Sequence, residues 1–278
     1  MHLKKVFSLS LTAAAIAALF LSGTAFSAEK GKVVIKGSTT VLPITMKGVE
    51  SFQKIKPNIS ISVEGSGSGN GINALFDGTC DIANSSREMK KDEWAKGKAT
   101  GMKIKEIAVS YDMIVPIVHP SNKIKNLTTD QLKAIFDGSI TNWKEVGGDD
   151  MRIVVISRES SSGTYEYWHE SIMKKKDIRK DALLQASNGA VVNTVANNPK
   201  SIGYIGFGYM DSSIKGLDVN GIPATLKNGK SGKYPVSRKL YMYVNEVKYS
   251  AETKSFVNFL LGKEGQKLVS EAGFIPVK

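Results

Sequence analysis

Short apolar runs alternate along the chain with segments whose apolar residues recur at helical spacing. Ile59 to Val63 alternates apolar and polar residues as a half-buried strand does, and Arg152 to Ser157 has the apolar character of a strand. Leu127 to Phe136 carries apolar residues at helical spacing, and Thr128-Thr129-Asp130 provides an N-cap. This alternation predicts an α/β protein with mixed sheets.

The same two patterns predict the remaining elements. Further strands are expected at 32–36, 104–109, 113–118, 202–207 and 240–244, and further helices at 43–52, 71–76 and 164–173. Near the end, one amphipathic helix is expected to carry Phe256, Val257, Leu260 and Leu261 on one face, with Leu268 beyond them. No repeat and no long linker divides the chain, which is compatible with domains that the chain enters and leaves more than once.

The first residues have the order of a secretory signal peptide. Lys4 and Lys5 precede the apolar run Val6 to Leu21, and small residues follow up to Ala28. A membrane anchor is the alternative, but the run is short for a spanning helix and no stop-transfer charges follow it. We therefore expect residues 1–27 to be removed. Because no cysteine lies near this cut, we expect a periplasmic protein without a lipid anchor, with secretion as the alternative.

The formal net charge is +12, and removal of the signal peptide would take away the two lysines it contains. The remaining lysines are scattered and no basic stripe interleaved with aromatic residues is present, so the charge favours steering of small anions over binding of nucleic acid. Cys80 is the one cysteine, which excludes an intrachain disulfide. Its neighbours resemble the start of a buried strand, and we expect it to be buried and inert.

Three segments share a pattern of a strand, a turn rich in Ser, Thr and Gly, and the start of a helix. They are Ile35 to Pro43, Val63 to Ile72 and Ile156 to Tyr165. A helix N-terminus offers unpaired N–H groups and partial positive charge, hydroxyl groups add donors, and the fork of Arg158 can hold two oxygens at once. If the turns converge, they form a site for a tetrahedral oxyanion. No cluster of metal ligands accompanies them, so neither a metal nor a cofactor is expected.

Each turn also has an ordinary interpretation. Gly37 to Thr40 alone is a common N-cap, and Arg158 alone could be a structural ion pair. The Gly65 to Gly71 segment resembles a nucleotide loop, but Asn70 occupies the third glycine position of Gly-x-Gly-x-x-Gly and no P-loop lysine follows.

An enzymatic function has weak support. Ser160 to Ser162 and His169 lie about two helical turns apart, too far for a Ser-His pair to meet directly. His2 leaves with the signal peptide, and His119 precedes Pro120 in an expected loop. We therefore expect a binding protein and no catalysis.

In these turns and in several further sequence blocks, the chain resembles the phosphate-binding proteins of ABC importers, the Pst type of the periplasmic-binding-protein superfamily. The resemblance runs over nearly all of the mature chain, and its blocks are Gly37 to Pro43, Gly67 to Gly71, Asp81 to Arg87, Asn126 to Thr128, Ile140 to Trp143, Arg158 to Thr164 and Ile202 to Phe207.

That resemblance implies a type II fold of two α/β lobes, with two mixed sheets flanked by helices and a ligand cleft between the lobes. Two hinge crossings are expected, near Tyr111-Asp112 and near Val236 to Tyr241. Lobe one would then comprise residues 28–111 plus 239–278, and lobe two residues 112–238.

The resemblance also implies roles in phosphate binding. Thr40 and the backbone of Val41 would hold the anion, supported by Ser38 and Thr39, and Ser68 would donate from the second turn. The grip of lobe two would consist of Arg158, Ser162, Gly163 and Thr164.

One position departs from the family pattern. Ser86 stands where well-known members have an aspartate that accepts the proton of hydrogen phosphate and repels sulfate. A serine here leaves the selectivity between these two ions open. Arg87 beside it is either a further anion contact or a rim ion pair.

The implied function is high-affinity binding of inorganic phosphate by an exported monomer that delivers it to permease subunits in the inner membrane. Two alternatives stay open. One is a binder of another tetrahedral oxyanion such as sulfate, molybdate or tungstate, and the other is a phosphate-sensing or surface protein with no transport role.

Overall fold

The computed structural model describes residues 31–278, so the predicted signal peptide lies outside the described residues. Within 31–278, no helix combines the length and apolar character needed to cross a membrane.

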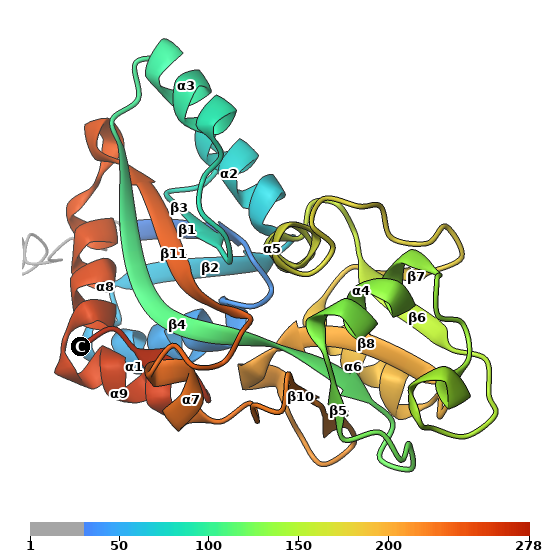
Figure 1. The fold of residues 1–278 in the computed structure, drawn as a ribbon. Helices are drawn as coiled ribbons and strands as arrows, with labels where there is room; N and C mark the ends of the chain where they lie inside the picture. The colour runs from blue at the N-terminus through green and yellow to red at the C-terminus, as the bar shows by residue number, and fades with distance from the viewer. Residues whose placement is uncertain (1–30) are drawn as a thin grey trace, which may run out of the picture. The chain divides into compact units, whose positions relative to one another are not determined.

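The described chain alternates strands and helices in the order shown in Figure 1. The strands are β1 (Gly31–Gly37), β2 (Ile59–Gly65), β3 (Ile82–Ser85), β4 (Ile104–Val118), β5 (Asn126–Leu127), β6 (Val154–Arg158), β7 (Leu183–Gln185), β8 (Ser201–Gly206), β9 (Lys215–Gly216), β10 (Asp218–Val219), β11 (Ser237–Asn245) and β12 (Ile275–Pro276). The α-helices are α1 (Leu42–Ile55), α2 (Ser68–Phe76), α3 (Lys91–Ala99), α4 (Thr129–Asp137), α5 (Gly163–Ser171), α6 (Asn188–Ala196), α7 (Leu226–Lys230), α8 (Ala251–Leu261) and α9 (Lys263–Glu271). The 3₁₀ turns are η1 (Trp143–Val146), η2 (Phe207–Tyr209) and η3 (Glu246–Lys248).

The main sheet has the strand order β2-β1-β3-β11-β4-β8-β6-β7, with β9 and β12 also paired to β4. β1 pairs in parallel with β2 and β3, whereas β11 is antiparallel to both β3 and β4. β8 is antiparallel to β4 and parallel to β6. The expected α/β class with mixed sheets is therefore confirmed. Where the resemblance implied two mixed sheets, these strands form one sheet that is continuous through β4, which pairs with β11 over its first part and with β8 over Ile114–Val118.

Two predicted boundaries were wrong. The strands expected at 104–109 and 113–118 are one strand, β4, the long curved green arrow in Figure 1. The polar residues Ser110 and Asp112 interrupt the apolar pattern but not the ladder, in which both keep partners on β11. The single helix expected near the end is two helices, because Gly262 has an extended backbone with ψ of 174° and separates α8 from α9.

The large buried side chains form two main cores. The first core draws its residues from 33–109 and 240–274, and a small cluster around Ile72, Leu75 and Tyr243 packs nearby. The second core draws all its buried residues from 113–236 and includes Trp143 and Trp168. The division into lobes 28–111 plus 239–278 and 112–238 stays a prediction.

Candidate anion-binding site

Four helices begin directly after strands and turn their N-terminal residues toward a common cluster of polar side chains. α1 follows β1, α2 follows β2, α5 follows β6 and α6 follows β7. Because β1 pairs in parallel with β2, and β6 with β7, each pair of helix starts lies at the carboxyl edge of its strands, where ligands commonly bind in α/β proteins. The N-terminal amides of these helices have no partner within their own helix. Some of them have partners elsewhere, as the Tyr165 and Ala190 amides do in the Ser162 and Ser187 side chains, and the others are donors available to an anion.

Contacts between segments far apart in sequence show that the three predicted turns lie together. The Thr40 Oγ1 and Thr164 Oγ1 atoms are 2.9 Å apart. The Gly69 amide donates to the Ser161 carbonyl at 3.0 Å. Ser68 Oγ lies 3.3 Å from Ser86 Oγ and accepts the Ser86 amide at 3.0 Å. The first, second and third turns and the strand end at Ser86 thus form one cluster.

All ten residues that the sequence predicts for the site are buried in or beside this cluster: Ser38, Thr39, Thr40, Val41, Ser68, Ser86, Arg158, Ser162, Gly163 and Thr164. Two of these side chains hydrogen-bond to the backbone of their own turns. Ser38 Oγ accepts the Thr40 amide at 3.1 Å and shapes the first turn. Ser162 Oγ caps α5 by accepting the Tyr165 amide at 3.2 Å. Neither the cap nor the turn requires these residues to contact a ligand themselves.

Arg158, the last residue of β6, is the cationic group that the prediction placed at the site. Its guanidinium is held by the Gln185 carbonyl at 3.0 Å and the Ala186 carbonyl at 2.9 Å, and it donates to Thr39 Oγ1 at 3.3 Å. Its Nη1 has no hydrogen-bond partner among residues 31–278. Burial lowers the pKa of Arg158 to about 10, and the nearby charge of Arg238 adds to this effect. The side chain therefore stays positively charged at neutral pH.

Asn188 at the start of α6 belongs to the same cluster, although it was not predicted from the sequence. Its Nδ2 donates to Thr39 Oγ1 at 3.0 Å and to Thr40 Oγ1 at 3.1 Å, and its Oδ1 accepts the Gly206 amide at 3.1 Å. The signal was present, because Ser187-Asn188-Gly189 follows a short strand and opens a helix, as in the three turns that were recognised. Tyr209 supports the first turn from another direction by donating to the Thr39 carbonyl at 2.5 Å.

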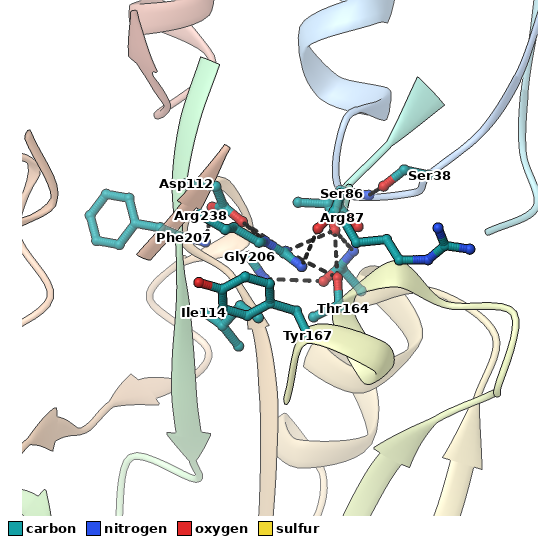
Figure 2. A network of polar contacts seen from close by, with 12 residues as sticks. Ser38, Ser86, Arg87, Asp112, Ile114, Thr164, Tyr167, Gly206, Phe207 and Arg238 are labelled. Carbon is teal, nitrogen blue, oxygen red and sulfur yellow. Dashed lines mark hydrogen bonds and ion pairs between the residues drawn. The ribbon is translucent and has the colours of Figure 1, made fainter. Parts of the chain in front are cut away.

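A second guanidinium, that of Arg238, also reaches the cluster and was not predicted. Arg238 on β11 faces Asp112 on β4 in the ladder, and its Nε and Nη2 donate to Asp112 Oδ2 at 3.0 and 2.8 Å. Figure 2 shows Arg238 between Asp112 on one side and Ser86 and Thr164 on the other. The two side chains form a buried ion pair. Burial raises the pKa of Asp112, and the charge of Arg238 opposes that effect.

Arg87, whose role the sequence left open, is part of an ion-pair cluster. Its guanidinium donates to both carboxylate oxygens of Glu93 at 2.7 Å, and its Nε lies 2.9 Å from Glu166 Oε2. Lys90 Nζ is 2.6 Å from the same Glu166 oxygen. Both carboxylates raise the pKa of Arg87 against the opposing effect of burial. The ion-pair interpretation of Arg87 therefore matches the structure.

Features considered for other chemistry are accounted for within the described residues. His169 stacks on Tyr165, with ring centroids 5.7 Å apart, and His119 is hydrogen-bonded to Ser121 in a loop. Cys80 is buried, and this burial raises the pKa of its thiol to about 12. No group of three or more His, Cys, Asp or Glu residues in 31–278 is arranged to hold a metal ion.

Comparisons with known proteins agree with this fold. Residues 22–264 match the family model described as a PBP superfamily domain. The chain is 37% identical to the phosphate-binding protein PstS of Borreliella burgdorferi, over 88% of this chain and 90% of the relative. It is 34% identical to protein SphX of Synechococcus elongatus, over 96% of this chain and 84% of the relative.

A solved structure is similar over the same span. It is a putative phosphate ABC transporter substrate-binding protein with bound phosphate from Clostridium perfringens, with 37% identity and a TM-score of 0.85, covering 89% of this chain and all of that one (100%). The chain belongs to the Pst-type phosphate-binding proteins of ABC importers, within the periplasmic-binding-protein superfamily.

Proposed function

We propose that this protein is exported, captures inorganic phosphate at the cluster of helix starts and delivers it to the permease of an ABC importer. The observation that carries the proposal is the convergence of four helix N-termini and several buried hydroxyl groups on Arg158, whose Nη1 has no partner within residues 31–278. The bound phosphate named for the Clostridium perfringens relative supports the same ligand.

Phosphate would be held almost entirely by hydrogen-bond donors. Free amides at the starts of α1, α2 and α5, the hydroxyls of Thr40, Ser68 and Thr164, and the Arg158 guanidinium would donate to it. Moving an ion out of water costs several kcal/mol of hydration free energy, and charge-assisted hydrogen bonds in the site must offset this cost. A saturated shell of donors around a fixed guanidinium meets that requirement without a metal.

Binding would be coupled to closure of the two lobes. Thr40, Ser68 and Ser86 lie on segments that pack with the first core or with the small cluster beside it, whereas Arg158 and Thr164 lie on β6 and α5 of the second core. A ligand that contacts both groups favours the closed arrangement over any arrangement that separates them. β4 contributes residues to both cores, and β11 begins directly after Val236 of the second core and contributes to the first, so these two strands would form the hinge.

The ion pair between Arg87 and Glu166 gives a test of closure away from the ligand. Glu166 lies on α5, and its partners Arg87 and Lys90 lie between β3 and α3. Replacing Glu166 by glutamine is expected to cost about 1 kcal/mol of closure, or about fivefold in phosphate affinity, mostly as faster dissociation. Stopped-flow kinetics would measure it.

The matched control is Glu170→Gln, an exposed carboxylate on the same helix for which no ion pair occurs among the described residues. It should leave the dissociation rate unchanged. Equal dissociation rates for the two variants would contradict a closure step that separates these segments.

Capture itself is tested by calorimetric titration of the protein from Ala28 onward, after unfolding and refolding to remove carried-over ligand. Micromolar or tighter phosphate binding is expected. No heat from phosphate would refute the proposed ligand and direct the search to molybdate or tungstate. Delivery is tested separately, by whether the protein restores phosphate uptake to vesicles that contain the permease.

A further inference from the structure

Arg238 is buried, and its guanidinium points toward the hydroxyl groups of the cluster. Its guanidinium Nη2 lies 3.1 Å from Thr164 Oγ1 and 3.5 Å from Thr40 Oγ1, the two hydroxyls that face each other across the cluster. Its Nη1 donates to the Ser86 carbonyl at 3.0 Å. The Arg238 side chain is 1% exposed, so water does not compensate its charge. A guanidinium in this position acts on whatever occupies the cluster.

Asp112 holds the guanidinium of Arg238 in place, and both of its carboxylate oxygens have hydrogen-bond donors. One carboxylate oxygen accepts both Nε and Nη2 of Arg238, and the other accepts the Phe207 amide at 3.0 Å. Within residues 31–278, no other side-chain carboxylate hydrogen-bonds to Arg238, Arg158 or the hydroxyl groups of the cluster. The cluster thus contains two guanidinium groups and one carboxylate, which is already paired.

This arrangement determines which property of an anion the site can recognise. A protonated oxyanion is selected by a free carboxylate that accepts its proton, and Ser86 supplies a hydroxyl there instead. Because Asp112 balances the charge of Arg238, the net positive charge of the cluster comes from Arg158, and in a water-poor environment it favours the ligand with more negative charge, while Arg238 adds N–H donors. The Ser86 hydroxyl lies 3.3 Å from Ser68 Oγ, so it has a neutral partner and no charge to repel a fully ionised anion.

We propose that Arg238 is a second anion-contacting guanidinium and that the site recognises tetrahedral dianions by their charge, so that sulfate is bound as well as hydrogen phosphate. This inference rests on the proposed phosphate site. It adds a specificity-determining residue and a wider class of ligand.

The first experiment titrates the wild-type protein with phosphate, sulfate and perchlorate, the last being a tetrahedral anion with one charge. Sulfate is expected to bind within about tenfold of phosphate, and perchlorate to give no measurable heat. Phosphate binding without sulfate binding would overturn the inference and leave the proposed function intact. Absence of phosphate binding would instead refute the proposed function.

The second experiment isolates the Arg238 guanidinium. Arg238→Gln is expected to lower the affinities for phosphate and sulfate alike by at least about 30-fold. Because this variant leaves Asp112 buried without its partner, the double variant Asp112→Asn with Arg238→Gln provides a neutral pair of similar shape, and Asp112→Asn alone keeps the arginine. The double variant should lose binding and the single asparagine variant should retain it. Equal affinities for these two would overturn the role of Arg238.

The third experiment restores a proton acceptor. Ser86→Asp is expected to abolish sulfate binding while retaining phosphate binding, because the new carboxylate repels the fully ionised ion and accepts the phosphate proton. A folded Ser86→Asp protein that binds sulfate as the wild type does would contradict recognition by charge at this position.

Discussion

Replacing Arg158 by alanine is expected to reduce phosphate affinity by about 2–5 kcal/mol, because a buried anion would lose a charged partner. Arg158 is 2% exposed and anchored by two carbonyl groups, at Gln185 and Ala186, which hold the guanidinium in place before any ligand arrives. Calorimetry with phosphate would measure the loss. An Arg158→Lys variant should recover part of it, since lysine keeps the charge but cannot form the fork.

The control is Arg152→Ala, which removes an arginine just before the same strand. Arg152 pairs with Asp181 at the surface, and its side chain is 72% exposed. It should leave phosphate affinity unchanged. If Arg158→Ala bound phosphate as tightly as Arg152→Ala, while circular dichroism showed both to be folded, the site would have to lie elsewhere.

Replacing Gly163 by alanine is expected to reduce phosphate affinity by about 1–3 kcal/mol through overpacking of the closed form. A Cβ atom at Gly163 would lie 2.4 Å from Ser68 Oγ and 2.8 Å from Ser86 Oγ, both on segments that pack with the other core. The added methyl group would hold these segments apart. Because an open arrangement has room for it, the melting temperature without ligand should change little, and only the ligand-induced increase should shrink.

Gly189→Ala is the matched control, since Gly189 also lies in the first turn of a helix, α6. A Cβ atom there would meet only Ser187 Oγ, at 3.9 Å, which is ordinary contact. Phosphate binding should survive this change. A large loss of unliganded stability in Gly163→Ala would show that the segments do not separate and would contradict the hinge proposal.

The residues that could be predicted from the sequence are those whose function is local. The turns after β1, β2 and β6 combine Gly, Ser and Thr with a helix start, and this chemistry is visible within about ten residues of chain. The structure places these turns together as the prediction required. Residues such as Ser38 and Ser162 were found for the same reason, although their side chains act on their own turns.

Asp112 and Arg238 could not be found in this way, because the role of each depends on its pairing with the other. They are 126 residues apart in sequence and meet because β4 and β11 are antiparallel neighbours. Asp112 within an apolar strand was a visible anomaly, and it led to the wrong division of β4 into two strands. The pairing that makes a buried carboxylate tolerable is a tertiary contact, which no local pattern reveals.

The sequence ranges of the two cores also affect the order in which the chain can fold as it is synthesised. The second core uses residues 113–236 alone, so it can form as soon as that continuous segment is available. The first core needs residues 33–109 together with 240–274, which are made more than a hundred residues later. The N-terminal part of the first core therefore lacks its packing partners while the second core forms. This delay postpones completion of the candidate site, which includes Arg238 of β11, until most of the protein has been made.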